Sequence, residues 1–321
     1  MPAILQPTVG AGTGCRLVSS PTSRRTSWTF ENPPMFEVRT SCLEGLGLVA
    51  LRKIAPGERI LQESPLLLWE VQHEHISTPH YDKECLPAKL DDIGVQRATY
   101  YALSQNQKYG TEKTAHGIWQ TNAYPLTSSS AAVFTHASRI NHSCRPNTHN
   151  DYNAALGQMT VHAAKAIAAG EEITVSYLGH EGSERAVRQR NLRSRFGFKC
   201  TCSLCALASE ARQCSDTRQR EMGVLGRRLA SPDGQDDETR LHVPRFALVE
   251  KYLALSAKEG LPTTWGRALL FDCARRCRSA GDLAGAYAWA ARAAECALLG
   301  SGDDCASYLM LKSFLDARAP V

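Results

Sequence analysis

The order of apolar and polar residues near the start of the chain predicts short β-strands. FEVRT, residues 36–40, alternates between the two kinds of side chain, as in a strand with one buried face. Two apolar runs follow, LGLVALRKI at 46–54 and RILQESPLLL at 59–68. Residues 55–58, Ala-Pro-Gly-Glu, have the composition of a turn between them. We therefore expect an opening that is rich in β-hairpins.

The middle of the chain mixes helical and strand patterns. Residues 86–108 have a partial apolar face at helical spacing, which predicts a helical insert within about 73–116. Short strands are expected at 117–124, 159–162 and 172–177, with a turn before the last of them. The apolar face of the insert is made by Leu90, Ile93, Ala98, Tyr101 and Leu103.

Helical patterns dominate after residue 182. SERAVRQRNLRSR, residues 183–195, predicts a basic helix with Ser183 as its N-cap. Further on, glycines separate three Ala- and Leu-rich segments, which predict three packed helices similar to tetratricopeptide-like repeats. These segments are 263–281, 281–300 and 302–317. Residues 231–238 are polar and predict a loop.

The composition narrows the class of protein. With 321 residues and a hydrophobic share of 43%, the chain has enough apolar side chains for a sizeable core. A net charge of +5 is small for this length, so we do not expect nucleic acid as a direct ligand. No apolar stretch is long enough for a membrane helix. Residues 1–34 are rich in Ser, Thr, Pro and Gly and predict a disordered tail; a transit peptide is the alternative.

The twelve cysteines are better explained by a metal than by disulfides. We expect an intracellular chain, in the nucleus, the cytoplasm or both, where thiols stay reduced. KCTCSLC presents Cys200, Cys202 and Cys205 on one short loop, and a structural zinc needs four ligands. Cys144 is a candidate for the fourth, because Pro146 stiffens its polar loop. At this point Cys214, His142 and His180 remain alternatives.

Four motifs, taken together and in this order, resemble the SET-domain protein-lysine methyltransferases. EGLGLVALRKIAPGERILQESPLL, 44–67, is similar to the opening strands of that family. RINHSCRPN, 139–147, resembles its cofactor loop, GEEITVSYL, 170–178, its tyrosine-bearing strand, and KCTCSLC its post-SET zinc loop. The SMYD-like group and its fungal relatives are most similar, except that this chain lacks the cysteines of a MYND finger.

The resemblance implies an α+β fold with small sheets, a pseudoknot, a helical insert, a post-SET zinc loop and a helical C-terminal region. The implied units are a SET domain at 35–180, a zinc-binding segment at 181–206 and a helical domain at 207–321. The implied zinc ligands are Cys144 and the three cysteines of the KCTCSLC loop, so the resemblance settles the open fourth position on Cys144.

The resemblance also implies S-adenosylmethionine (SAM) as methyl donor and a role for each matching residue. Tyr177 is implied to be catalytic, and the cofactor contacts are Gly45, Leu46, Gly47, Asn122, Ser138, Asn141, His142 and Phe198. Phe196 and Phe198, with Tyr177, would line the lysine channel. SMYD-like enzymes commonly have Tyr where this chain has Phe196, a change that alters the number of methyls added or weakens activity.

Three hypotheses follow from these residues. The first is a monomeric SAM-dependent enzyme that methylates lysine in a histone or another protein, with a structural zinc. The second is a weak or inactive SET-fold scaffold, which the missing hydroxyl at Phe196 favours. The third is a zinc-dependent nucleic-acid binder, which rests only on the cysteine spacing and the mild basicity. The first accounts for all four motifs.

Overall fold

A computed structural model describes residues 34–43, 45–70, 86–179, 182–230 and 243–317 of the chain. The predictions for residues 1–33, 73–85, His180 and 231–238 lie outside these described residues. Within the described ranges, no helix has the length and apolar character that a membrane crossing requires. The described strands are β1 (Phe36–Thr40), β2 (Leu46–Ala50), β3 (Arg59–Glu63), β4 (Leu67–Glu70), β5 (Tyr124–Pro125), β6 (Ser130–Val133), β7 (Asn141–His142), β8 (Thr148–Asn153), β9 (Gln158–Ala163) and β10 (Glu172–Val175). The described α-helices are α1 (Leu86–Asp92), α2 (Arg97–Tyr101), α3 (Ala115–Asn122), α4 (Arg185–Phe196), α5 (Ser209–Ala230), α6 (Val243–Lys258), α7 (Arg267–Ser279), α8 (Leu283–Ser301) and α9 (Ala306–Asp316). The described 3-10 turns are η1 (Gly94–Gln96), η2 (Gln107–Tyr109), η3 (Ala137–Arg139) and η4 (Thr263–Gly266).

Three small sheets make up the β part of the fold, in the strand orders β1-β2-β10-β7, β3-β9-β8 and β4-β6-β5. Their inner faces enclose a core of apolar side chains that includes Leu48, Phe134 and Ile173. The mixed α+β class with several small sheets is therefore confirmed. In the first sheet, β10 pairs with β7 in parallel and with β2 antiparallel, which brings three distant segments of sequence together.

The predicted strands at 36–40, 159–162 and 172–177 are confirmed by β1, β9 and β10. The expectation of hairpins in the opening is only partly right. β1 and β2 form a hairpin, but β3 pairs with β9 and β4 with β6. The turn at 55–58 therefore leads into another sheet, because the apolar residues of β3 face partners about a hundred positions further along the chain.

The strand predicted at 117–124 is wrong, since most of that segment is helix α3. The Thr114 side chain accepts a hydrogen bond from the N–H of Gly117 and so caps the first turn. Ile118, Trp119 and Asn122 are all buried, which is the spacing of a helix face. Only Tyr124 and Pro125 are extended. The insert at 86–108 is helical, as predicted, but it breaks into α1, η1, α2 and η2.

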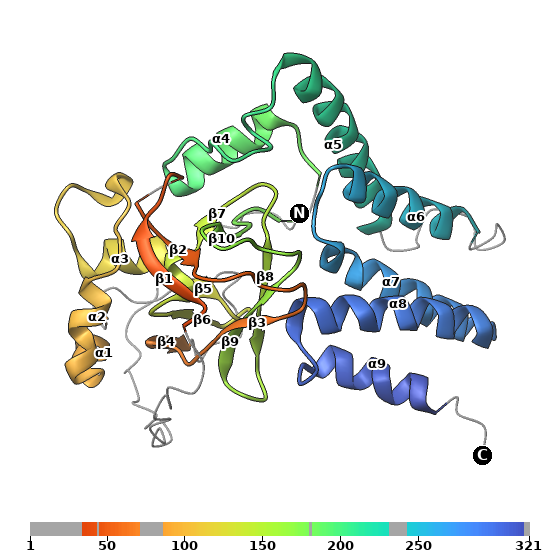
Figure 1. The fold of residues 1–321 in the computed structure, drawn as a ribbon. Helices are drawn as coiled ribbons and strands as arrows, with labels where there is room; N and C mark the ends of the chain where they lie inside the picture. Colours follow the sequence, from red (N-terminus) through yellow and green to blue (C-terminus); the bar gives the residue numbers. More distant parts are fainter. Residues whose placement is uncertain (1–33, 44, 71–85, 180–181, 231–242, 318–321) are drawn as a thin grey trace, which may run out of the picture.

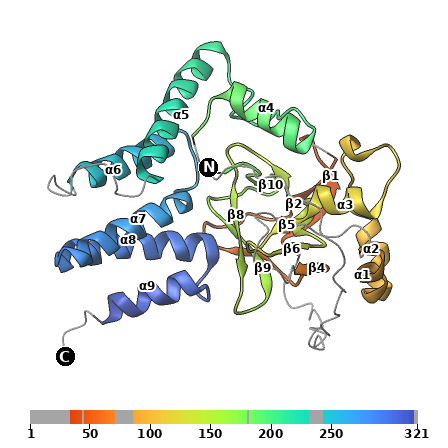
Figure 2. The same cartoon turned by 180° about the vertical axis from the view of Figure 1, so that it is seen from behind.

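Helix α4 is confirmed, but its predicted cap is not. Glu184 occupies the N-cap position and makes no capping bond, while the carbonyl of Ser183 accepts from the Arg188 guanidinium. The three predicted C-terminal helices correspond to α7, α8 and α9, and α5 and α6 precede them. These helices lie to one side of the sheets (Figure 1), and the reverse view gives the same arrangement (Figure 2). α8 contacts β8 and β9 and so joins the two parts.

Candidate functional site

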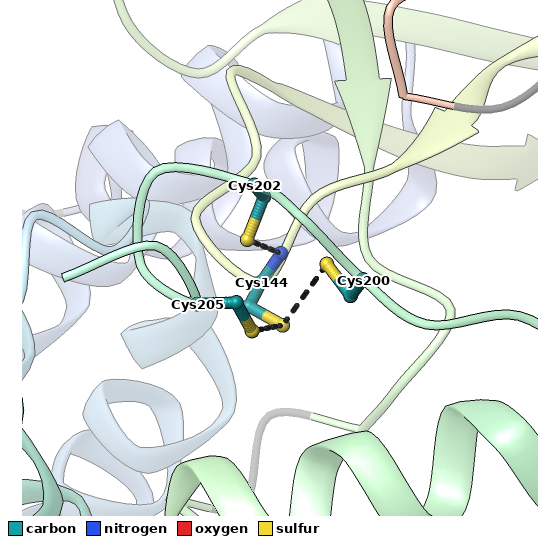
Figure 3. A group of neighbouring side chains, drawn as sticks. All are labelled: Cys144, Cys200, Cys202 and Cys205. Atoms are coloured by element: carbon teal, nitrogen blue, oxygen red, sulfur yellow. Dashed lines mark hydrogen bonds between the residues drawn. The ribbon is translucent and has the colours of Figure 1, made fainter.

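Four buried cysteines from two distant segments meet beside β7. Cys144 lies two residues after the end of β7, and the other three lie on the loop after α4; all four sulfurs lie within 4.8 Å of one another. Figure 3 shows Cys144 between Cys200 and Cys205, with Sγ–Sγ separations of 4.0 and 3.6 Å. A tetrahedral zinc with Zn–S of about 2.3 Å holds its sulfurs roughly 3.8 Å apart. The cluster therefore fits a structural zinc.

The four thiols hydrogen-bond to one another, and a cation lies beside them. These mutual hydrogen bonds raise the pKa of Cys144 and lower the pKa values of Cys202 and Cys205, that of Cys205 to about 7. The guanidinium of Arg188, which is almost fully buried, lies 4.0 Å from Cys205 Sγ and supplies positive charge. Of the alternatives for the fourth ligand, Cys214 is exposed on α5 and is not part of the cluster.

Parallel pairing of β7 with β10 places the residues of the NHSC motif beside the strand that ends near Tyr177. Asn141 is opposite Thr174 and His142 is opposite Val175. The Asn141 amide donates to Glu172 Oε1 at 2.8 Å and to the Leu46 carbonyl at 3.3 Å. The orientation of this amide is thus fixed by the opening strands and by β10 together.

The glycines of the opening turn have two different roles. Gly45 has a φ of +50°, which favours glycine because a side chain is strained there. Gly47 has no such angle, but an added Cβ would lie 2.3 Å from Glu172 Oε1 and 2.9 Å from Asn141 Nδ2. Gly47 is therefore needed for the close approach of β2 to the pair formed by Asn141 and Glu172.

A cavity of about 380 Å³ opens beside these elements. Its volume falls within the usual range of about 300–1,000 Å³ for small-molecule sites. Of the residues predicted to contact the cofactor or line the channel, all except Gly47 line it: Gly45, Leu46, Asn122, Ser138, Asn141, His142, Tyr177, Phe196 and Phe198.

The Tyr177 hydroxyl is held at one wall of this cavity by a 2.7 Å hydrogen bond to the Ile140 carbonyl. The Tyr177 ring lies 5.1 Å from the ring of Phe196 and 6.3 Å, edge to face, from that of Phe198. Burial lowers the pKa of the adjacent His142 to about 4, so this imidazole is neutral at pH 7. The rings next to Tyr177 are thus aromatic or neutral, and such surroundings disfavour an ammonium group.

Asn122 and Ser138 reach the cavity wall, but their side chains are engaged within the protein. The Asn122 amide donates to the carbonyls of Ser104 and Ile118, both at 2.7 Å. The Ser138 hydroxyl donates to the Asn122 carbonyl and accepts from the N–H of Phe134. Both residues therefore shape the wall through hydrogen bonds made within the protein.

Sequence reasoning missed several residues of the site. Glu172 orients Asn141 and also accepts from the Ser41 hydroxyl at 2.8 Å; its only signal was the second Glu of the GEE motif. Asn106 and Lys108, on the η2 segment of the insert, line the cavity and donate to the carbonyls of Phe196 and Arg195. No motif marked them, because the insert had been interpreted only as helical.

Comparison with known proteins agrees with this geometry. Residues 45–178 match the model of the SET domain. That range runs from the Gly45 turn through β10 to just past Tyr177. It includes most of the cavity wall, but not Leu43 or the lining residues at and after the end of α4.

The chain is similar to the histone-lysine N-methyltransferase set5 of Schizosaccharomyces pombe, with 29% identity over 85% of this chain and 81% of the relative. The histone-lysine N-methyltransferase SET5 of Meyerozyma guilliermondii is 39% identical over 26% of this chain and 17% of its own length. The mouse protein-lysine N-methyltransferase SMYD4 is 42% identical over 23% of this chain and 9% of its own length. Residues 45–178 of this chain therefore form a SET domain, and over most of its length the chain is similar to a histone-lysine methyltransferase.

Proposed function

We propose that this protein transfers a methyl group from SAM to the side-chain amine of a lysine in a histone or another protein. The observation that carries the proposal is the convergence of Tyr177, Asn141 and His142 on one cavity inside a SET domain. The S. pombe relative, which this chain matches over most of its length, is described as a histone-lysine methyltransferase, and this supports a lysine-bearing protein as substrate.

The cavity residues fit the parts of SAM by their chemistry. Leu46 and the backbone of the Gly45 turn would approach the cofactor closely, while Asn141 and His142 would bind it from β7. Asn122 and Ser138 would form the rest of the wall, and Phe198 would pack against an apolar part of the ligand. When bound, SAM supplies an electrophilic methyl on a sulfonium, so the protein must mainly position the acceptor.

Tyr177 is the proposed catalytic residue. Its hydroxyl is oriented by Ile140, and its ring forms one side of an aromatic wall with Phe196 and Phe198. A lysine amine, with an ordinary pKa of about 10.4, must lose its proton before it can attack. An apolar channel favours the neutral amine and excludes water, and orientation of the reacting atoms can contribute several kcal/mol.

The four clustered cysteines would hold one structural zinc. Cys144 belongs to the same loop as Asn141 and His142, so the metal would fix the cofactor loop to the segment that carries Phe196 and Phe198. The ion would have no open position for chemistry, since all four ligands are thiolates.

We further propose that the protein acts as a monomer in the nucleus, the cytoplasm or both.

The test is transfer of label from methyl-labelled SAM to proteins of a eukaryotic cell extract. We expect labelled bands with the wild type, and loss of roughly 10²-fold or more of the label with Tyr177→Phe, because the acceptor is then misplaced. Tyr152→Phe is the matched control: Tyr152 lies on β8 outside the cavity lining, and this variant should label normally.

Absence of label with every variant, from folded protein that contains zinc, would contradict the proposal and favour the scaffold hypothesis. Phe196→Tyr would then be tested, because the missing hydroxyl at that position is the departure that motivates the scaffold. Equal labelling by wild type and Tyr177→Phe would instead exclude Tyr177 from catalysis while leaving the activity in place.

A further inference from the structure

The positive charge of this protein is concentrated in one short segment. Residues 185–209 contain five Arg, one Lys and no Asp or Glu. That is one more charge than the net +5 of the whole chain, so the remaining residues together are net −1. The small net charge of the whole chain thus includes one segment with a large positive charge.

Four cations of this segment face solvent. Arg190 and Arg193 lie on the side of α4 opposite the buried Arg188 and Leu192, and three positions apart they are neighbours on the helix surface. Arg195 and Lys199 are also exposed, at and just after the end of α4. We call these four residues, together with Lys108, the basic rim.

The solvent-facing cations of the basic rim have no carboxylate partner in the described part of the chain. Elsewhere, exposed arginines are commonly paired, as in Arg97 with Asp91 and Arg292 with Glu250. Arg193 and Arg195 complement the helix dipole in the last turn of α4, which is worth only about 0.3–1 kcal/mol each. That effect does not explain Arg190, which lies before the last turn, or Lys199, which follows the helix.

The basic rim lies beside the candidate active site. Lys108 and Arg195 both line the cavity, and the Lys108 ammonium donates to the Arg195 carbonyl, which joins the η2 segment to the end of α4. α4 lies at the edge of the molecule, away from α7, α8 and α9, in both views (Figures 1 and 2). An extended ligand on the rim would therefore meet no obstruction from those helices.

We propose that the basic rim binds the phosphate backbone of nucleic acid. The guanidinium group matches phosphate through two parallel hydrogen bonds, and three of the five rim residues are arginines. A phosphate backbone also carries closely spaced negative charges along a line, and these can pair with the neighbouring arginines on α4. This inference replaces the expectation, drawn from the whole-chain charge, that nucleic acid is not a direct ligand.

Under the proposed function, this surface would let the enzyme meet its protein substrate on nucleic acid. That use depends on the methyl transfer proposed above, whereas the binding itself does not. Nucleic acid is favoured over an acidic protein segment because the rim is contributed mainly by a straight helix face and its arginines. An acidic segment remains an outcome that the experiment must distinguish.

The experiment is fluorescence anisotropy of a labelled duplex DNA with the full-length protein, without SAM, between about 50 and 200 mM salt. We expect the logarithm of the binding constant to fall with the logarithm of salt with a slope of about −3, from three or four phosphate contacts. Arg190→Gln combined with Arg193→Gln should weaken binding about tenfold and reduce the slope by about 2.

The matched control is Lys258→Gln with Lys312→Gln, which removes the same charge from exposed positions on α6 and α9. It should bind DNA like the wild type, and all variants should keep the wild-type zinc content and melting temperature.

Equal weakening by the control pair, or no binding at low salt, would overturn the proposal. Stronger competition by polyglutamate than by unlabelled DNA would assign the surface to an acidic protein instead. Because SAM is absent, none of these results depends on methyl transfer.

Discussion

The backbone N–H of Tyr177 donates a hydrogen bond to Nδ1 of His142 at 2.9 Å. An Nδ1 that accepts must be unprotonated, so in the neutral ring the proton is on Nε2. That nitrogen lies 3.2 Å from Cys144 Sγ, where its N–H can donate to a thiolate. His142 therefore connects Tyr177, the proposed catalytic residue, on one side with the cysteine cluster on the other, while its own side chain lines the cavity.

The first prediction concerns zinc retention. His142→Ala removes the hydrogen bond to Cys144 Sγ without removing a ligand, and we expect zinc affinity to fall about 10–100-fold, as for other groups that orient metal ligands. The measurement is competition with a chromophoric chelator at pH 7. Asn141→Ala is the control, since the Asn141 amide donates to Glu172 and to the Leu46 carbonyl.

Asn141→Ala should keep the wild-type zinc affinity and lose SAM affinity by calorimetric titration. If His142→Ala binds zinc as tightly as the wild type, the contact at 3.2 Å has no energetic role, and the link between Tyr177 and the cluster is only geometric.

The convergence at the site could be predicted because each part has a local sequence signal. Asn141, Tyr177 and the three cysteines of KCTCSLC stand in short motifs whose residue types are themselves the chemistry. The resemblance could also assign Cys144, whereas spacing alone left three alternatives. Its placement 3.6 Å from Cys205 Sγ depends on the turn after β7 and on the loop after α4, which meet only in three dimensions.

What could not be predicted depends on tertiary contacts. Residues 117–124 have the β-branched and aromatic content of a strand, yet the cap from Thr114 and the burial of Ile118 and Trp119 make most of them helix. The basic helix at 183–195 was predicted, but a binding surface on it was not, because the total charge averages this segment with the rest of the chain. Glu172 was missed because its role exists only once β10 lies beside β2 and Asn141.

The second prediction concerns pH and stability. His162 is buried, and this burial, followed by the nearby Arg59 cation, lowers its pKa to about 4. The Arg59 Nε–H donates to His162 Nε2 at 3.1 Å, so protonation of that nitrogen would place two donors face to face. The carboxylates of Asp151, Asp303 and Asp304 act in the opposite direction and are outweighed.

In the unfolded chain His162 has its ordinary pKa of about 6.5 and binds a proton more readily than in the native state. The contribution of this group is therefore complete above pH 6.5 and is lost as the pH falls toward 4, by about 3 kcal/mol in total. His162→Gln keeps an acceptor for Arg59 but does not titrate. Urea unfolding at several pH values should show a shallower decline for the variant, and an unchanged decline would refute the assignment.

The third prediction concerns the contact between the cofactor loop and the C-terminal helices. Glu259 is fully buried and accepts hydrogen bonds from Ser215, Arg218 and Gln219, and the Arg145 guanidinium lies 3.8 Å away. Burial alone would raise the pKa of Glu259, but these hydrogen bonds outweigh it and lower the pKa, so the group is ionised. Arg145 directly follows Cys144, so this carboxylate joins the loop after β7 to α5 and to the end of α6.

Glu259→Gln leaves two arginines beside a neutral buried group, and we expect a loss of about 3 kcal/mol in the free energy of unfolding. Glu250→Gln is the control, because its pair with Arg292 is exposed and should contribute less than about 1 kcal/mol. Denaturant unfolding measures both. Equal losses in the two variants would mean that the Glu259 cluster is no more than another surface ion pair.

The fourth prediction concerns the number of methyl groups added. Phe196 faces Tyr177 with 5.1 Å between the ring centroids, and both rings line the cavity. Phe196→Tyr introduces a hydroxyl that takes up room beside the amine and can accept a hydrogen bond from it. We expect the variant to stop at fewer methyl groups than the wild type, because each added methyl needs space and removes a donor. Intact-mass analysis of a labelled substrate, followed over time, measures the product distribution.

Phe314→Tyr, on α9 and outside the cavity lining, is the control and should give the wild-type distribution. An unchanged distribution in Phe196→Tyr, at equal turnover, would mean that the acceptor lysine does not pass Phe196 and enters the cavity along another wall.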